Sequence, residues 1–211
     1  MKTLVLCDDL YHSGAIVEAG LKPLEGQAIS FDFRWDTSGF VPEDLEGYRV
    51  VCLCKANRFS AEKEGEWLTE AVQRRFVAFV ENGGGLLVLH AGTTAAKTAP
   101  LLRELTGCVF DHHPEQCAVQ YVVTKETSIT QYAHSFAGED EHYFLRFDAQ
   151  DAEIFLESRS AAGVQPAGYF RQQGKGRVCV MTPGHTLPVW RNKEYQIMLK
   201  NAIFWCGGYE I

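Results

Sequence analysis

The sequence has no long hydrophobic run and no cluster of basic residues. A helix that crosses a bilayer needs about 20 consecutive apolar residues, and the longest run among these 211 residues is far shorter. The 20 Lys and Arg are outnumbered by 27 Asp and Glu, so the net charge is −7, which disfavours a nucleic-acid backbone as partner. We therefore expect no membrane and no nucleic-acid partner, and a small molecule as ligand.

The cysteines lack the even number and regular spacing of a disulfide framework. There are seven of them, and most lie inside apolar segments, as buried free thiols of a reducing compartment do. The apolar stretch that opens the chain is broken by Asp8 and Asp9 after five residues, whereas the core of a secretion signal needs roughly 7–15. These features predict a cytoplasmic protein.

Strand-like and helix-like segments alternate in the first half of the chain. Strands are expected at 4–7, 29–33, 50–54 and 86–89, three of which are continuous apolar runs. Helices are expected within 67–80 and 95–106, where apolar residues recur at helical spacing before Gly83 and Gly107. Such alternation predicts parallel strands joined by right-handed helical crossovers.

This alternation ends after about residue 108. Strand-like segments follow at 118–123, 153–157, 168–171 and 177–181, and an apolar helix face that includes Tyr195 and Ile203 closes the chain. Residues 108–147 have no strong helix pattern and are expected to form an irregular insertion. We predict one domain over residues 1–211 with an α/β fold, a three-layer sandwich around a mostly parallel central sheet.

Polar residues follow the ends of the predicted parallel strands, which is where open α/β sheets bind ligands. Asp9 and His12 come after the first strand, His90 follows the strand at 86–89, and His185 follows the strand at 177–181. Because the carboxyl ends of parallel strands meet at one edge of a sheet, we expect these side chains to converge there.

His90 stands at the tip of a strand–turn–helix segment, LLVLHAGTTA. A nucleophile elbow presents Ser or Cys in that setting, but the sequence has no G-x-S-x-G and no Cys at the tip, which disfavours covalent acyl chemistry. His90 is therefore a candidate acid, base or metal ligand. The alternative is a histidine whose nitrogens are bound by backbone groups at the end of a strand.

The segment FDHHPEQ holds two adjacent histidines. Neighbouring residues of an extended chain point to opposite sides, and Pro114 favours an extended His113, so we predict that His113 faces the site and His112 does not. The pair lacks the H-x-x-x-H spacing of a zinc motif. A solvated pair of loop residues is the alternative.

The GEDEHY segment combines carboxylates with an aromatic residue that packs on the core. We expect an anchored Glu141 to have a raised pKa and to act as a general base, with Asp140 and Tyr143 as ligand-binding neighbours. The alternative is a solvated charged face. His134 and His142 have no supporting neighbours and are expected to be structural.

Taken together, these segments resemble the ThuA-like (trehalose utilisation) family, which has the flavodoxin-like fold of class I glutamine amidotransferases. The similar elements run in order along nearly the whole chain: His12, GGGLLVLHAG, FDHHPE, GEDEHY and the block PAGYFRQQGKGRVCVMTPGH that ends in His185. The sequence departs from the family at 127–129, where Thr-Ser-Ile replaces a frequent His-Pro-Ile. The amidotransferases have a Cys where this chain has His90, so the resemblance does not imply glutamine hydrolysis.

The family's association with disaccharide utilisation and with oxidoreductases that form 3-keto sugars implies a sugar derivative as the ligand. We expect an enzyme, a lyase, isomerase or hydrolase, whose catalytic residues are His90, Glu141 and His185. Substrate would be bound by Asp9, His12, His113, Asp140 and Tyr143. No cofactor is certain, and the candidate is a divalent metal such as zinc at His90 and His113. A noncatalytic sugar-binding or regulatory module is the alternative, and the sequence leaves open whether the chain forms a homo-oligomer.

Overall fold

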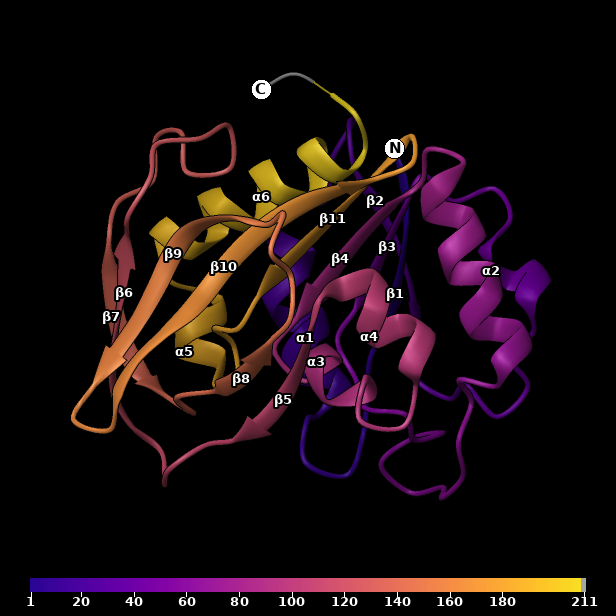
Figure 1. Cartoon of the computed structure of the whole chain (residues 1–211), viewed down its shortest axis with the longest axis horizontal. Coiled ribbons are helices and arrows are strands. Elements are labelled where there is room, and N and C mark those ends of the chain that lie inside the picture. The colour runs from indigo at the N-terminus through magenta and orange to yellow at the C-terminus, as the bar shows by residue number, and fades with distance from the viewer. Residues whose placement is uncertain (210–211) are drawn as a thin grey trace.

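The computed structural model describes residues 1–209 and has a large twisted sheet at its centre (Figure 1). The strands of this sheet are β1 (Lys2–Leu6), β2 (Ser30–Arg34), β3 (Val50–Leu53), β4 (Gly85–Leu89), β6 (Cys117–Val123), β7 (Phe136–Asp140), β9 (Glu153–Ser160), β10 (Gly163–Gln173) and β11 (Gly176–Met181). They are ordered β2-β1-β3-β4-β11-β10-β9-β6-β7. A separate two-stranded sheet pairs β5 (Cys108–His112) with β8 (Phe144–Phe147).

The central sheet is parallel in one half and antiparallel in the other. β2, β1, β3, β4 and β11 are all paired in parallel, whereas β11, β10, β9, β6 and β7 are paired antiparallel. The prediction of a mostly parallel sheet therefore describes only the first half. The turns between β9 and β10 and between β10 and β11 are short, so these neighbours must pair antiparallel, because parallel neighbours need a long crossover.

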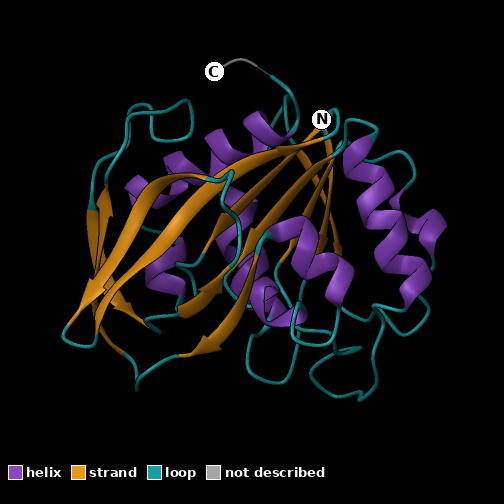
Figure 2. Ribbon diagram, in the orientation of Figure 1, coloured by secondary structure: helices purple, strands orange, loops and turns teal. Residues whose placement is uncertain are grey.

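Helices cover both faces of the sheet (Figure 2). They are α1 (Gly14–Leu21), α2 (Glu70–Glu81), α3 (Gly92–Ala95), α4 (Pro100–Thr106), α5 (Leu187–Trp190) and α6 (Lys193–Cys206), with 3₁₀ turns at Lys22–Leu24 and Pro42–Leu45. Apolar residues of α1, α5 and α6 belong to the core cluster on one face, and those of α2, α3 and α4 to the cluster on the other. The predicted three-layer α/β sandwich is confirmed.

Helix α2 begins later than its apolar pattern predicts. The Thr69 side chain accepts a hydrogen bond from the Val72 amide and caps the helix. Trp67 and Leu68, which fit the helical spacing, lie before the cap because the Asn57 side chain accepts hydrogen bonds from both of their backbone amides. Both side chains are nevertheless buried. The apolar pattern therefore identified core residues correctly, although the first two of them precede the helix.

Residues 108–147 are more regular than the sequence predicts. They contain the four strands β5 to β8, and β7 pairs with β6 in a register that sets Cys117 opposite Asp140. β5, β7 and β8 are only four or five residues long, and the polar residues of β5 and β7 hide the alternation that marks a strand. The paired strands bring Glu141 next to His90 and His185, which follow β4 and β11.

The cysteines are free thiols, and most of them are buried. Burial raises the pKa of Cys7 to about 12 and that of Cys108 to about 11, so these sulfurs stay protonated and unreactive at neutral pH. None of the helices in residues 1–209 is both long and apolar enough to span a membrane.

Leu87 tests the packing of the central sheet. It is fully buried in the middle of β4, in register with Cys52 of β3 and Cys179 of β11. We expect Leu87→Ala to lower the free energy of unfolding by about 2–5 kcal/mol, because the cavity that it leaves is surrounded by paired strands. Urea denaturation measures the change, and Val164→Ala, at a half-exposed position, is the control. Equal effects of the two substitutions would contradict the assigned core.

Candidate functional site

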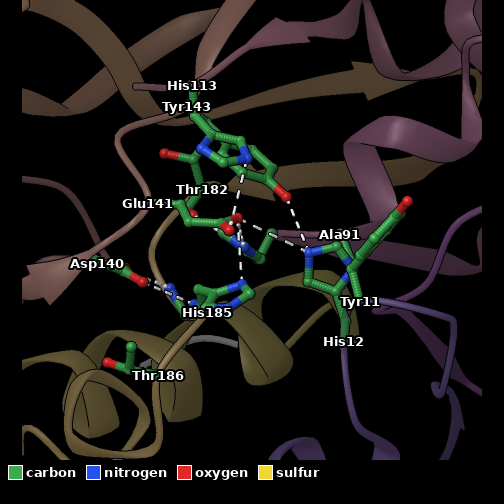
Figure 3. Close-up of polar contacts among 12 residues, drawn as sticks. Tyr11, His12, Ala91, His113, Asp140, Glu141, Tyr143, Thr182, His185 and Thr186 are labelled. Carbon is green, nitrogen blue, oxygen red and sulfur yellow. Dashed lines mark hydrogen bonds and ion pairs between the residues drawn. The ribbon is translucent and has the colours of Figure 1, made fainter. Parts of the chain in front are cut away.

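Four potential ligand side chains converge beyond the carboxyl ends of β1, β4 and β11. His12, His90 and His185 follow these three strands, and Glu141 follows β7. One donor atom from each lies within 4.8 Å of the donor atoms of the other three. The side chains of His12, Glu141 and His185 point toward one another in Figure 3. The sheet therefore brings together the three histidines expected at this edge.

The His90 imidazole is held by a backbone carbonyl. Its Nδ1 lies 2.7 Å from the Thr182 carbonyl oxygen, and because a carbonyl only accepts, Nδ1 carries the proton. Its Nε2 lies 3.4 Å from Glu141 Oε2. The residue has a φ of 41°, which is costly for a side chain other than Gly and is typical of functional turns. The strained turn presents an imidazole lone pair where an elbow would present a nucleophile.

The His12 imidazole is oriented by a buried carboxylate. Its Nδ1 lies 2.8 Å from Asp9 Oδ1. The same carboxylate also accepts hydrogen bonds from the amides of Tyr11, His12 and Ala56. Although burial acts to raise the pKa of Asp9, the hydrogen bonds from His12 and the backbone lower it overall. Burial lowers the pKa of His12, so the ring is neutral with its proton on Nδ1 and a lone pair on Nε2.

Glu141 is the centre of the cluster. Its Oε2 lies 3.1 Å from His185 Nδ1 and 4.0 Å from His12 Nε2, while its Oε1 lies 3.5 Å from His113 Nε2. Burial acts to raise the pKa of Glu141, but the contacts with His185 and His90 outweigh it and hold the pKa well below the usual range. The expectation of a raised pKa is therefore wrong. An ionised carboxylate of this kind is a poor base and a good ligand.

The same contact acts on His185 in the opposite direction. The 3.1 Å contact with Glu141 raises the pKa of His185 despite partial burial. The His185 side chain is 19% exposed, so it reaches the cavity described below. The contact with Glu141 therefore favours the protonated form of His185.

Asp140 faces the protein interior. Its carboxylate is fully buried and accepts hydrogen bonds of 2.8 Å from the amides of Gly184 and His185 and from the Tyr121 hydroxyl. It is not among the residues that line the cavity. The prediction that Asp140 binds substrate does not agree with this placement, because its oxygens are already occupied in positioning the backbone of His185.

Tyr143 lies in a stack of rings beside the histidines. Its ring centroid is 4.0 Å from that of His90, 4.3 Å from that of Phe110 and 5.7 Å from that of His113. Its hydroxyl lies 3.1 Å from His12 Nε2 (Figure 3). Because His12 keeps its proton on Nδ1, the hydroxyl donates this hydrogen bond.

A cavity of about 710 Å³ opens onto the cluster. Six of the predicted site residues line it: Asp9, His12, His113, Glu141, Tyr143 and His185. The lining also includes Asn57, one of the polar residues that follow the strand at 50–54, and Tyr11, Lys97 and Phe110, which the sequence patterns did not indicate. His90 is nearly fully buried beneath this lining. The volume is in the range of small-molecule sites.

The other three histidines lie outside the lining of this cavity. His112 is exposed, stacks on Phe144 and contacts Asp111, while the His134 amide donates to Glu194. The buried His142 has its Nδ1 2.7 Å from Ser160 Oγ. All three positions agree with the structural roles expected from the sequence.

The cluster fits a divalent metal ion. Within residues 1–209, the buried atoms His90 Nε2 and His185 Nδ1 have no hydrogen-bond partner, although polar atoms that are buried normally find one. Tetrahedral zinc with ligand distances near 2.0–2.1 Å requires donor atoms about 3.4 Å apart, and the contacts of Glu141 with His90 and His185 are 3.4 and 3.1 Å. The sequence predicted His90 and His113 as metal ligands. The four-residue group keeps His90, but it contains His12 and His185 and lacks His113.

The chain has similarities that extend over nearly all of its length. Residues 9–206 match the model of a family described as ThuA, trehalose utilisation. ThuA-like proteins from Bacteroides uniformis ATCC 8492 and Parabacteroides merdae ATCC 43184 are 21% and 20% identical to it, with TM-scores of 0.74 and 0.77. The matches cover 98% and 100% of this chain and 91% of each of those chains. At these identities the likeness shows a shared fold.

A β-galactosidase from Bacillus circulans sp. alkalophilus also contains this fold. It is 15% identical with a TM-score of 0.67, and the match covers 99% of this chain but 31% of the enzyme. A cytoplasmic protein from Salmonella typhimurium LT2 has a TM-score of 0.63 at 15% identity, with 99% and 98% of the two chains covered. No curated protein matches the sequence.

The position of Asp140 gives a prediction about stability. Asparagine retains one accepting oxygen, so Asp140→Asn leaves at least one of the three donors around it without a partner. We expect the free energy of unfolding to fall by about 1–3 kcal/mol, the cost of an unsatisfied buried group. Asp148→Asn is the control, because Asp148 forms an exposed ion pair with Arg103 and such pairs contribute little. Similar losses for both variants in urea denaturation would refute the positioning role.

Proposed function

The chain belongs to the ThuA, or trehalose utilisation, family, and on that basis we propose that it is a metal-dependent enzyme acting on a small sugar derivative. The family supports a role in carbohydrate utilisation. The metal proposal is carried by one observation, the convergence of three imidazoles on an ionised carboxylate with two buried nitrogens lacking partners. Neutral imidazoles with a carboxylate suit zinc and similar divalent ions.

The proposed ligands are His12 Nε2, His90 Nε2, His185 Nδ1 and the Glu141 carboxylate. Two neighbours prepare them: Asp9 holds the proton of His12 on Nδ1, and the Thr182 carbonyl does the same for His90. Partners of this kind fix the tautomer and orientation of histidine ligands. A bound divalent ion would polarise a carbonyl oxygen or activate a water molecule.

The proposed catalytic residues are still His90, Glu141 and His185, with a revised division of roles. The lowered pKa of Glu141 favours a ligand over a general base. His113 and Tyr143, which line the cavity, are the proposed substrate-binding side chains. A keto sugar suits this arrangement because its carbonyl oxygen is the group that such a centre polarises. The buried free thiols support a cytoplasmic location.

Metal binding tests the ligand set. We expect untagged protein dialysed against Zn²⁺ to hold one equivalent, measured by elemental analysis. Competition with a chromophoric chelator should show losses of affinity greater than about 100-fold for His90→Ala and His185→Ala. A loss of about 10–100-fold is expected for Asp9→Asn, which removes the negative charge that orients His12. His112→Ala and His134→Ala are matched controls that should bind as the wild type does. A metal content far below one equivalent would refute the metal centre.

Turnover is tested separately. NMR over several hours should show that the zinc-loaded protein consumes a 3-keto-glycoside, and that His90→Ala and Glu141→Gln abolish this activity. Binding of the sugar without consumption would support the alternative, a noncatalytic sugar-binding module. Full turnover by both variants would refute the assigned catalytic residues.

A further inference from the structure

We propose that the Tyr143 hydroxyl is a hydrogen-bond donor to a substrate oxygen that carries or develops negative charge. This role deepens the proposed function and rests on it, because it assumes that His12, His90, His185 and Glu141 hold a metal ion. It narrows the substrate class to compounds that present a carbonyl or another oxyanion-forming group to the centre.

The Tyr143 hydroxyl already has an acceptor within the cluster. Tyr143 donates to the Nε2 lone pair of His12 at 3.1 Å. The hydrogen bond between His12 Nδ1 and Asp9 leaves Nε2 as the only ring nitrogen of His12 with a lone pair. A metal ion and a hydroxyl hydrogen cannot share that lone pair. Metal binding by His12 therefore releases the hydroxyl, which needs a new acceptor.

The position of Tyr143 directs the released hydroxyl toward the ligand. The residue lines the cavity together with His12, Glu141 and His185, yet only 2% of its surface is exposed. Its ring is nearly parallel to that of His90, with an interplanar angle of 27°, and Phe110 packs against it. Little reorganisation is needed for a group held in this way, which is the condition for effective oxyanion stabilisation.

The phenol acts without losing its proton. A tyrosine hydroxyl, whose ordinary pKa is near 10, is protonated at neutral pH. The O–H bond stays intact, and the substrate oxygen accepts a hydrogen bond. The Tyr11 side chain also lines the cavity but is 76% exposed. It is not held in place by burial, so it provides a matched comparison.

Glu141 is the competing acceptor. Its carboxylate lies within the same cluster, and three imidazoles already surround Oε2 at 3.1, 3.4 and 4.0 Å. If Glu141 binds a metal ion, part of its negative charge is neutralised. It is then a weaker hydrogen-bond acceptor than an oxyanion in the cavity. If the hydroxyl nevertheless donates to Glu141, removing the Tyr143 hydroxyl will not affect the binding of an oxyanion.

The test uses the Co²⁺-loaded protein, whose visible absorption reports on metal ligands, with acetohydroxamate as the oxyanion probe and imidazole as a probe without an oxyanion. We expect Tyr143→Phe to raise the Kd of acetohydroxamate by about 10-fold or more, the effect of losing a hydrogen bond to a charged acceptor. Imidazole binding and Co²⁺ content should be unchanged. Tyr11→Phe should bind both probes as the wild type does.

Three results would overturn the proposal, and they differ in what they imply. An unchanged Kd for acetohydroxamate in a fully loaded Tyr143→Phe protein would refute the donor role while leaving the metal centre intact. Equal weakening of both probes would show that Tyr143 supports the metal ligands rather than the bound oxyanion. Failure of the wild-type protein to bind Co²⁺ would refute the proposed function and this inference together.

Discussion

The contact between one ionised carboxylate and three imidazoles is the interaction on which the rest of the site depends. Glu141 is buried among His12, His90 and His185, and a buried negative charge is costly unless positive or polar groups compensate it. His185 compensates part of this charge, because its Nδ1 lies 3.1 Å from the carboxylate and the contact raises the pKa of His185. The other two imidazoles are oriented from outside the cluster. Asp9 and the Thr182 carbonyl each take a proton-bearing nitrogen, so the remaining lone pairs are directed inward, where a cation would complete the arrangement.

Two residues next to the site have backbone conformations that are unfavourable in free energy. His90 has a φ of 41° at the end of β4, and Asp8 has a φ of 78° just after β1. Conformations of this kind persist only where the surrounding structure holds them in place. The parallel half of the sheet supplies that rigidity, because β4 is paired with β11 along its whole length and with β3 as far as Val88. Asp140 adds a further constraint by binding the amides of Gly184 and His185.

The antiparallel half of the sheet contributes the Glu141 carboxylate. The ends of the parallel strands bring three histidines to one edge, but they place no carboxylate at the centre of the three rings. The β6–β7 pair carries the chain back to this edge, so that Glu141 enters the cluster and Tyr143 packs against His90. The site is therefore shared between two parts of the sheet, which explains why its acidic and aromatic members come from a segment remote from the histidine-bearing strands.

Sequence patterns were enough to predict the three-layer α/β fold and the candidates at the carboxyl ends of the strands, His12, His90 and His185. Apolar runs and helical spacing are local patterns, and the position of a strand end follows from them directly. The tertiary structure was needed to show that β5, β7 and β8 accompany the predicted strand at 118–123, that Asp140 turns inward, and that the pKa of Glu141 falls rather than rises. These outcomes depend on hydrogen bonds between residues distant in sequence, such as that of His90 with Thr182, and local patterns carry no information about such partners.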